Sequence, residues 1–127
     1  LKQRDYGMPF APAIIAEDQH RYVKRGHFAP YMIETFETKE DRVDEIIAAV
    51  HPADQTTRPM TVNDWNPDWQ QIIREFKKIT GVGAIVNTSF NLHGYPLVGT
   101  PQHALWTFQH SDLDGLLLGD WLISKNN

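Results

Sequence analysis

Residues 66–91 read NPDWQQIIREFKKITGVGAIVNTSFN, a run that predicts a helix, a glycine stop and then a strand. Asn66 is a favoured N-cap residue, and Pro67 suits the first helical position because an N–H at that position has no intrahelical partner. An apolar stripe follows at helical spacing, formed by Trp69, Ile72, Ile73, Phe76 and Ile79. Gly81 then ends the helix, and residues 82–89 predict a strand. An amphipathic helix leading directly into an apolar strand indicates a sheet with helices packed on it.

The rest of the chain alternates in the same way between strand-like and helix-like segments. Pro9 and Pro12 favour extended backbone, which continues to Ala16. The other predicted elements are a helix at Glu17–Arg25 that stops at Gly26, a strand at Tyr31–Thr38, helical spacing over Val43–Val50, a strand at Met60–Val62, a helix opened by Thr100 and Pro101, and one or two strands within residues 115–124. The sequence therefore predicts an α+β fold, a mixed sheet covered by helices, in a single domain spanning residues 1–127.

The composition bounds the class of protein. A chain of 127 residues with 41% hydrophobic and 22% charged residues is normal for one globular domain. It has no cysteine, which fits a cytoplasmic protein, and its net charge of −4 disfavours nucleic-acid binding. No apolar run reaches the roughly 20 residues that span a membrane. Since the chain opens on Leu1 and not on Met, we expect a piece of a longer protein. The four tryptophans, Trp65, Trp69, Trp106 and Trp121, are interpreted as packing residues of the core.

The predicted strand that follows Gly81 ends in small polar side chains, Asn87, Thr88 and Ser89, with Asn91 close behind. Side chains alternate along a strand, so extended backbone would place Asn87, Ser89 and Asn91 on one face. A buried amide or hydroxyl without a partner costs about 1–3 kcal/mol, so either the protein, water or a ligand must satisfy these groups. A site for a small polar or anionic ligand is one interpretation. A turn is the other, because Asn and Ser are common turn formers and Gly94 follows.

Three cations are candidates for such a site. Lys2 and Arg4 lie two residues apart, and Arg58 stands in a polar loop. Guanidinium groups bind phosphate in a bidentate way, so these three side chains suit a phosphate or carboxylate ligand. The alternative is that Lys2 and Arg4 are solvated. The six histidines form no His-Glu-x-x-His motif, so no dedicated metal site is predicted; His51, just before the Arg58 loop, is the histidine of interest.

Several short motifs occur in order along the chain. They are Lys2-x-Arg4, Pro9-Phe10-Ala11-Pro12, Ala29-Pro30-Tyr31-Met32, the segment His51–Val62, Asn66-Pro67, Asn87-Thr88-Ser89-Phe90-Asn91, Gly94-x-Pro96, Thr100-Pro101, and Asp114-x-Leu116 with Gly119-Asp120. The set resembles the C-terminal domain of the NodU/CmcH-type O-carbamoyltransferases. The chain departs from the family pattern at Ala29, Gln55 and Met60, which stand where the family has Ser, Gly and Gln, and by one extra residue between His51 and Asp54.

The resemblance implies a fold and an activity. Family members have a smaller C-terminal domain that is YrdC-like, with a twisted mixed sheet, and makes carbamoyl-adenylate from carbamoyl phosphate and ATP with Mg²⁺. A larger actin-like N-terminal domain, which carries a metal site, then transfers the carbamoyl group to a hydroxyl acceptor. The chain would be the adenylation half of this biosynthetic carbamoyltransferase, and the N-terminal transferase domain would be its partner. Self-association into a homo-oligomer stays open, and the sequence does not encode the acceptor.

The resemblance also implies roles for individual residues. Lys2, Arg4 and Arg58 would contact phosphate oxygens, while Ser89 and Asn91 would hold the phosphate or carbamoyl end. The same pocket would be lined by Asn87 and Thr88, with His51, Asp54 and Thr56 as further candidates. Two other functions remain open: a non-catalytic nucleotide-binding or docking module, and a tRNA-modification relative that makes threonylcarbamoyl-adenylate.

Overall fold

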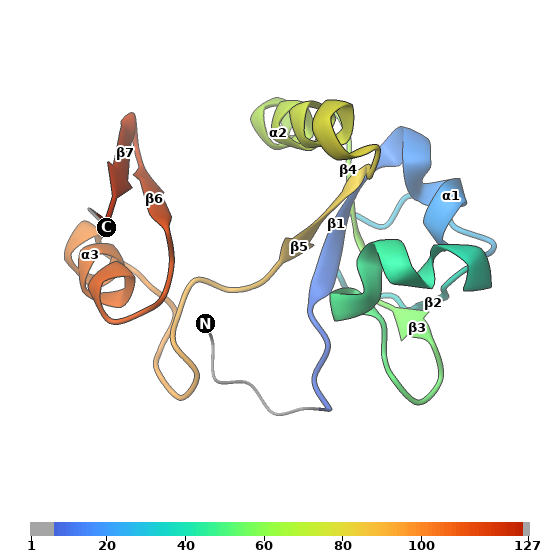
Figure 1. The fold of residues 1–127 in the computed structure, drawn as a ribbon, viewed down its shortest axis with the longest axis horizontal. Helices are drawn as coiled ribbons and strands as arrows, with labels where there is room; N and C mark the ends of the chain where they lie inside the picture. Colours follow the sequence, from blue (N-terminus) through green and yellow to red (C-terminus); the bar gives the residue numbers. More distant parts are fainter. Residues whose placement is uncertain (1–6, 126–127) are drawn as a thin grey trace. The chain divides into compact units, whose positions relative to one another are not determined.

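The computed structural model describes residues 7–125, which form two compact units, residues 7–88 and residues 89–125. Helices and strands are mixed within the chain, as Figure 1 shows, so the α+β class predicted from the sequence is confirmed. Among the described residues, no helix combines the length and the apolar composition that a membrane span requires.

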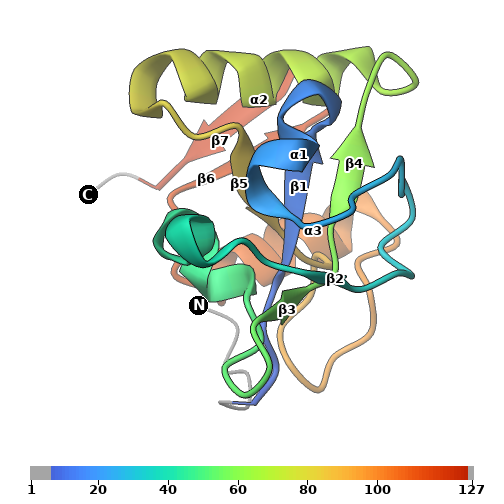
Figure 2. The same ribbon diagram turned by 90° about the vertical axis from the view of Figure 1, so that its right-hand side faces the viewer.

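A three-stranded mixed sheet forms the centre of the first unit. β1 (Ala11–Ile15) lies in the middle, parallel to β4 (Met60–Val62) and antiparallel to β5 (Ala84–Asn87). Figure 2 shows β1 between its two neighbours. The register places Ile14 opposite Thr61 of β4. Because β1 pairs along both edges, its short apolar sequence forms a stable strand without the polar alternation of an exposed one.

The α2 helix (Pro67–Thr80) covers one face of this sheet. Ala13 and Ile15 of β1 point to the same side because side chains alternate along a strand, and both pack with the fully buried Ile73 of α2. Val62 of β4 completes this cluster. The helix is thus held by the central strand and by one of that strand's neighbours.

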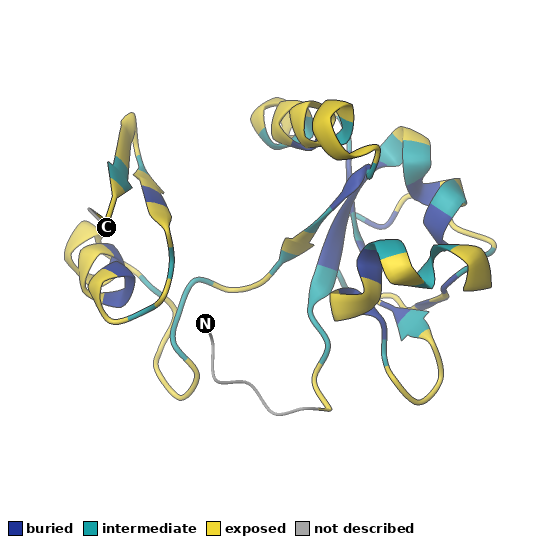
Figure 3. Ribbon diagram, in the orientation of Figure 1, coloured by how far each residue is buried: buried dark blue, intermediate teal, exposed yellow. Residues whose placement is uncertain are grey.

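The opposite face is covered by two short helical segments, α1 (Gln19–Tyr22) and the 3₁₀ segment η2 (Glu40–Ala49). Ile14 of β1 points to this side, where it shares a buried cluster with Tyr22 and Ile46. The sheet is therefore the middle of three layers, which explains why β1 is buried almost throughout (Figure 3).

Two predicted elements of the first unit are shorter than the sequence indicates. The helix predicted at Glu17–Arg25 begins as a 3₁₀ turn, η1 (Ala16–Asp18), and ends with α1 at Tyr22. The strand predicted at Tyr31–Thr38 is reduced to β2 (Phe36–Glu37), which pairs with β3 (Thr56–Thr57). Only a two-residue partner is available to β2 there, so the backbone before it is not part of a ladder.

The helix and strand that the sequence predicts best are α2 and β5. The Asn66 side chain accepts a hydrogen bond from the Trp69 amide at 3.3 Å, and Gly81 ends the helix at a φ of +78°. The apolar stripe of α2 is only partly covered, however. Ile73 is fully buried whereas Ile79 is 85% exposed, because the sheet beneath α2 is only three strands wide.

The second unit is a helix packed on a β-hairpin. α3 (Pro101–Gln109) begins at Thr100, whose hydroxyl accepts a hydrogen bond from the His103 amide at 3.2 Å. The strands β6 (Gly115–Leu118) and β7 (Trp121–Ser124) are antiparallel. The core of the unit consists of Ala104, Phe108 and Leu116, with five partly buried apolar side chains around them.

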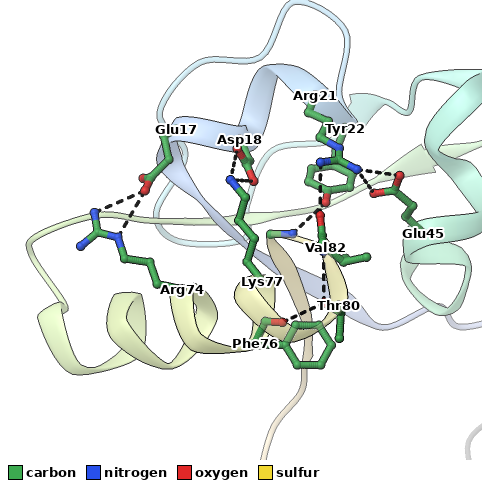
Figure 4. A network of polar contacts seen from close by, with 12 residues as sticks. Glu17, Asp18, Arg21, Tyr22, Glu45, Arg74, Phe76, Lys77, Thr80 and Val82 are labelled. Carbon is green, nitrogen blue, oxygen red and sulfur yellow. Dashed lines mark hydrogen bonds and ion pairs between the residues drawn. The ribbon is translucent and has the colours of Figure 1, made fainter.

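A polar network fastens the end of α2 and the start of β5 to the helical segments on the other face (Figure 4). Arg21 contacts both carboxylate oxygens of Glu45 at 2.9 and 3.0 Å and donates to the Gly81 carbonyl at 3.2 Å. The Tyr22 hydroxyl accepts a hydrogen bond from the Gly83 amide at 2.9 Å. Lys77 of α2 lies 2.7 Å from a carboxylate oxygen of Asp18. These contacts fix the turn between α2 and β5.

Gly83 has no room for a side chain. A Cβ atom at this position would lie 2.1 Å from the Asp18 carboxylate oxygen and 3.1 Å from a methyl group of Ile15. We expect Gly83→Ala to lower the free energy of unfolding by about 1–3 kcal/mol, measured by urea denaturation. Gly7→Ala is the control, because nothing lies within 4 Å of its Cβ position. Equal stability of the two variants would contradict this packing.

Acid should weaken the polar network. Burial opposes ionisation of Glu45, but hydrogen bonds from Arg42, Arg21 and Tyr22 outweigh it and hold the pKa of its carboxyl below the ordinary 4.5. A carboxyl with a lowered folded-state pKa stabilises the fold above its unfolded-state pKa, and this contribution is lost as the pH falls through the lowered value. We expect Glu45→Gln to cost about 1–2 kcal/mol at neutral pH and progressively less as the pH falls from the ordinary 4.5 through the lowered value, by denaturant unfolding over this pH range. A cost that does not depend on pH would contradict the role of the charge.

Candidate functional site

Lys2 and Arg4 lie outside the described residues. The other candidates divide between the two units. Asn87, Thr88 and the loop that contains Arg58 belong to the first unit. Ser89 and Asn91 belong to the second. Convergence of all these residues on one anion site therefore stays a prediction from the sequence.

Three of the candidates build the loop that connects η2 with β3. Asp54 accepts hydrogen bonds from the Thr56 amide at 3.0 Å and from the Thr56 hydroxyl at 2.8 Å, and it lies 3.2 Å from His51 Nδ1. The hydrogen bond from the Thr56 amide, and after it the one from the Thr56 hydroxyl, hold the pKa of the Asp54 carboxyl below its usual value. Gln55, at a φ of +56°, turns the chain in this loop. The polar groups of this loop therefore bond mainly to one another and hold its shape.

Arg58 follows this loop directly, between β3 and the buried Pro59. Its side chain is exposed, and among residues 7–125 its guanidinium has no hydrogen-bond or ion-pair partner. The backbone on both sides is anchored while the charged group faces solvent. Arg58 is thus a cation placed on a rigid support and available to an anion.

Asn87, the last residue of β5, lies beside two methionines. Its amide nitrogen is 3.5 Å from the Met32 sulfur and 3.4 Å from the Met60 sulfur. Thioether sulfur is a weak acceptor, so the amide donors are only weakly satisfied. Thr88, the next residue, is exposed. The polar strand end predicted from the sequence is therefore present at Asn87, where Met60 lies beside the amide.

Ser89 and Asn91 form a compact turn at the start of the second unit. The Ser89 hydroxyl donates to Asn91 Oδ1 at 2.7 Å, and the Asn91 amide hydrogen-bonds to the Ser89 carbonyl at 3.2 Å. The Asn91 side-chain nitrogen donates to the carbonyls of Leu92 at 3.0 Å and Tyr95 at 2.9 Å. Both hydrogens of that nitrogen are thus used to shape the loop. The expectation that Asn87, Ser89 and Asn91 share one strand face is wrong, because β5 ends at Asn87 and the chain turns at Ser89.

A pocket of about 400 Å³ opens beside this turn, within the second unit. Tyr95 and Trp106 are among its lining residues, with ring centroids 5.3 Å apart. The sequence interpretation missed it by treating the tryptophans as core residues. That interpretation is wrong for Trp65, Trp106 and Trp121, whose exposed fractions are 69%, 40% and 77%. The helical spacing of His103, Trp106 and His110 is the sequence signal that could have found one wall.

Residues 1–125 match the family described as "Carbamoyltransferase C-terminus". The chain belongs to this family. It is 40% identical to an uncharacterized protein of Methanocaldococcus jannaschii, over 97% of the chain and 24% of that protein. It is 35% identical to the nodulation protein NolNO of Sinorhizobium fredii, over 98% of the chain and 19% of that protein. To the 3'-hydroxymethylcephem-O-carbamoyltransferase of Amycolatopsis lactamdurans it is 26% identical, over 94% of the chain and 23% of that protein.

The chain spans about a fifth to a quarter of the length of these curated relatives. The sequence motifs indicate a resemblance to the carbamoyltransferase C-terminal family, and the family match over residues 1–125 confirms it. Within residues 7–125, no group of three or more His, Asp or Glu side chains is placed to hold a metal ion.

The Ser89–Asn91 turn should depend on the Asn91 amide. We expect Asn91→Ala to speed amide hydrogen exchange at Tyr95 and Val98 about 30-fold, because the loss of two side-chain hydrogen bonds of about 1 kcal/mol each loosens the loop. The amides of β1 should be unaffected. Asn63→Ala is the matched control, since that side chain caps the Trp65 amide in the first unit. Unchanged exchange in the loop of Asn91→Ala would contradict this role.

Proposed function

We propose that the chain is the adenylation part of an O-carbamoyltransferase, which binds carbamoyl phosphate and ATP and forms carbamoyl-adenylate. The observation that carries this proposal is the match to the carbamoyltransferase C-terminal family across residues 1–125. The proposal is supported by the hydroxyl and amide turn of Ser89 and Asn91 and by the available cation of Arg58. The hydroxyl acceptor belongs to the later transfer step.

The chemistry needs positive charge and fixed donors. Carbamoyl phosphate and ATP are both anions. Water must release inorganic phosphate from carbamoyl phosphate to leave carbamate, whose oxygen then attacks the α-phosphate of ATP, where further charge develops as pyrophosphate leaves. Cations and hydrogen-bond donors that are already in place stabilise this charge without reorganising. Arg58 is assigned to phosphate oxygens, and Lys2 and Arg4 to the same task. No protein cage for Mg²⁺ is found within residues 7–125, so Mg²⁺ would be held mainly by the phosphates of ATP.

Ser89 and Asn91 receive different tasks. Asn91 spends both side-chain donors on the loop carbonyls and accepts the Ser89 hydroxyl, so it is a positioning residue. Ser89 is assigned to contact the phosphate or carbamoyl group directly, and its single hydroxyl hydrogen then passes from Asn91 Oδ1 to the ligand. Asn87 and Thr88 are assigned to contact the ligand in this proposal, whereas His51, Asp54 and Thr56 shape the loop that carries Arg58.

We further propose that a transferase domain precedes this chain and receives the carbamoyl-adenylate. The support is the length of the relatives, of which the chain covers about a fifth to a quarter. The first product is a reactive mixed anhydride, which water would destroy in solution. A second domain that accepts it directly would protect it.

The test is exchange of labelled pyrophosphate into ATP that depends on carbamoyl phosphate, measured with the 127-residue chain and with the complete protein that contains it. We expect Ser89→Ala to slow exchange about 100-fold, as loss of one preorganised donor does, and Arg58→Ala to slow it at least 10-fold. Ser111→Ala and Arg74→Ala are the controls, because Ser111 bonds to the Phe108 carbonyl and Arg74 pairs with Glu17.

Exchange at the wild-type rate in both variants would overturn the residue assignment. Binding of ATP without any exchange in the complete protein would favour the non-catalytic nucleotide-binding module instead.

A further inference from the structure

The pocket beside the Ser89–Asn91 turn has aromatic walls. Tyr95 forms one, and Trp106 of α3 forms another at a centroid distance of 5.3 Å and an interplanar angle of 44°. His110 stacks on Trp106 at 4.3 Å and 22°, and its Nδ1 lies 2.8 Å from the Trp106 carbonyl. The indole is therefore supported on one face by a second ring, which fixes its orientation.

The face of α3 that lines the pocket follows from helical spacing. His103, Trp106 and Thr107 recur at three- and four-residue intervals, while Ala104 and Phe108 turn into the core. Pocket residues and core residues thus occupy two adjoining stripes of one helix. The helix is anchored through its core stripe; in the other stripe His103 and Trp106 are exposed, while Thr107 is buried.

The chemistry of the pocket suits a planar ring. Two aromatic side chains, with Leu97 and Val98, supply flat and apolar contact, while His103 and Thr107 carry the groups that could bond to ring nitrogens. Tyr95 and Trp106 remain 56% and 40% exposed, so part of each side chain is open to a ligand, although His110 covers one face of the indole and the Tyr95 ring lies beside it. A volume of about 400 Å³ accommodates a base with part of its sugar.

Backbone and side-chain hydrogen bonds join the pocket to the Ser89–Asn91 turn. The Asn91 side chain donates to the Tyr95 carbonyl at 2.9 Å, and the Val98 amide donates to the Phe90 carbonyl at 3.0 Å. The loop that positions Ser89 is thus the same loop that builds the pocket wall, and both lie in the second unit. A ligand with a ring at one end and phosphates at the other fits this combination.

We propose that the pocket lined by Tyr95 and Trp106 binds the purine base of the nucleotide, with the phosphates directed toward Ser89. This inference rests on the proposed function for the identity of the nucleotide. The base is held by stacking and by the polar groups of α3. The positioning residue Asn91 couples the base site to the phosphate site.

The experiment is a calorimetric titration of the 127-residue chain with adenosine, ATP and ribose 5-phosphate, the last of which lacks a base. Adenosine and ATP should bind, and Trp106→Leu should weaken both at least 10-fold, because stacking on an aromatic side chain contributes most of the base affinity. Trp106→Phe should restore much of it. Trp121→Leu is the matched control, since Trp121 is also exposed and lies in the same unit on β7. Circular dichroism checks that each variant is folded.

The possible outcomes separate this inference from the proposed function. Absence of adenosine binding, or equal binding by Trp106→Leu, overturns the base site, as expected if a polypeptide segment covers the pocket instead. Exchange activity that depends on Ser89 would still support the proposed function in that case. Conversely, adenosine binding that depends on Trp106, with no exchange in the complete protein, keeps the base site and rejects carbamoyl adenylation.

Discussion

Burial of β1 on both of its faces is the constraint on which the first unit depends. Ile14 points to one helical layer while Ala13 and Ile15 point to the other, so a single five-residue strand holds three layers together. All five side chains of β1 are apolar, and its two edges pair with β4 and β5. The polar contacts of Arg21 and Glu45 hold α1, η2 and the turn after α2 together. The packing of both helical layers on β1 is what brings these elements close enough to make those contacts.

Local signals explain which parts of the fold the sequence predicts well. The α2 helix is specified by its own residues, from the Asn66 cap to the glycine at Gly81, and β5 follows at once. The segment Tyr31–Thr38 alternates like a strand, yet among the described residues its ladder covers Phe36 and Glu37, with one isolated bridge from Thr38 to Val23, because ladder length depends on a partner elsewhere in the chain. Local periodicity does not show which segment a strand pairs with, so the length of such strands is predicted less well.

The candidate site follows the same division. Arg58 and the polar character of Asn87 and Ser89 could be read from residue types. A turn at Ser89 is one of the two interpretations that the residue types allow. They do not decide where it begins, because strand alternation predicts the side-chain direction only while the chain stays extended, and β5 ends at Asn87. Trp106 was assigned to the core on hydrophobicity alone. The assignment is wrong because α3 has two stripes: Ala104 and Phe108 lie in the core, whereas Trp106 lines the pocket.

The arrangement of the Asn91 amide has a consequence for which side chains this position accepts. Aspartate has nearly the same shape, but it would direct oxygen atoms at the carbonyls of Leu92 and Tyr95, where the amide nitrogen now donates. Oxygen facing oxygen repels, and a carboxylate has no hydrogen to offer. Isosteric replacement, by mutation or by deamidation, therefore changes the sign of two contacts while leaving the steric fit intact.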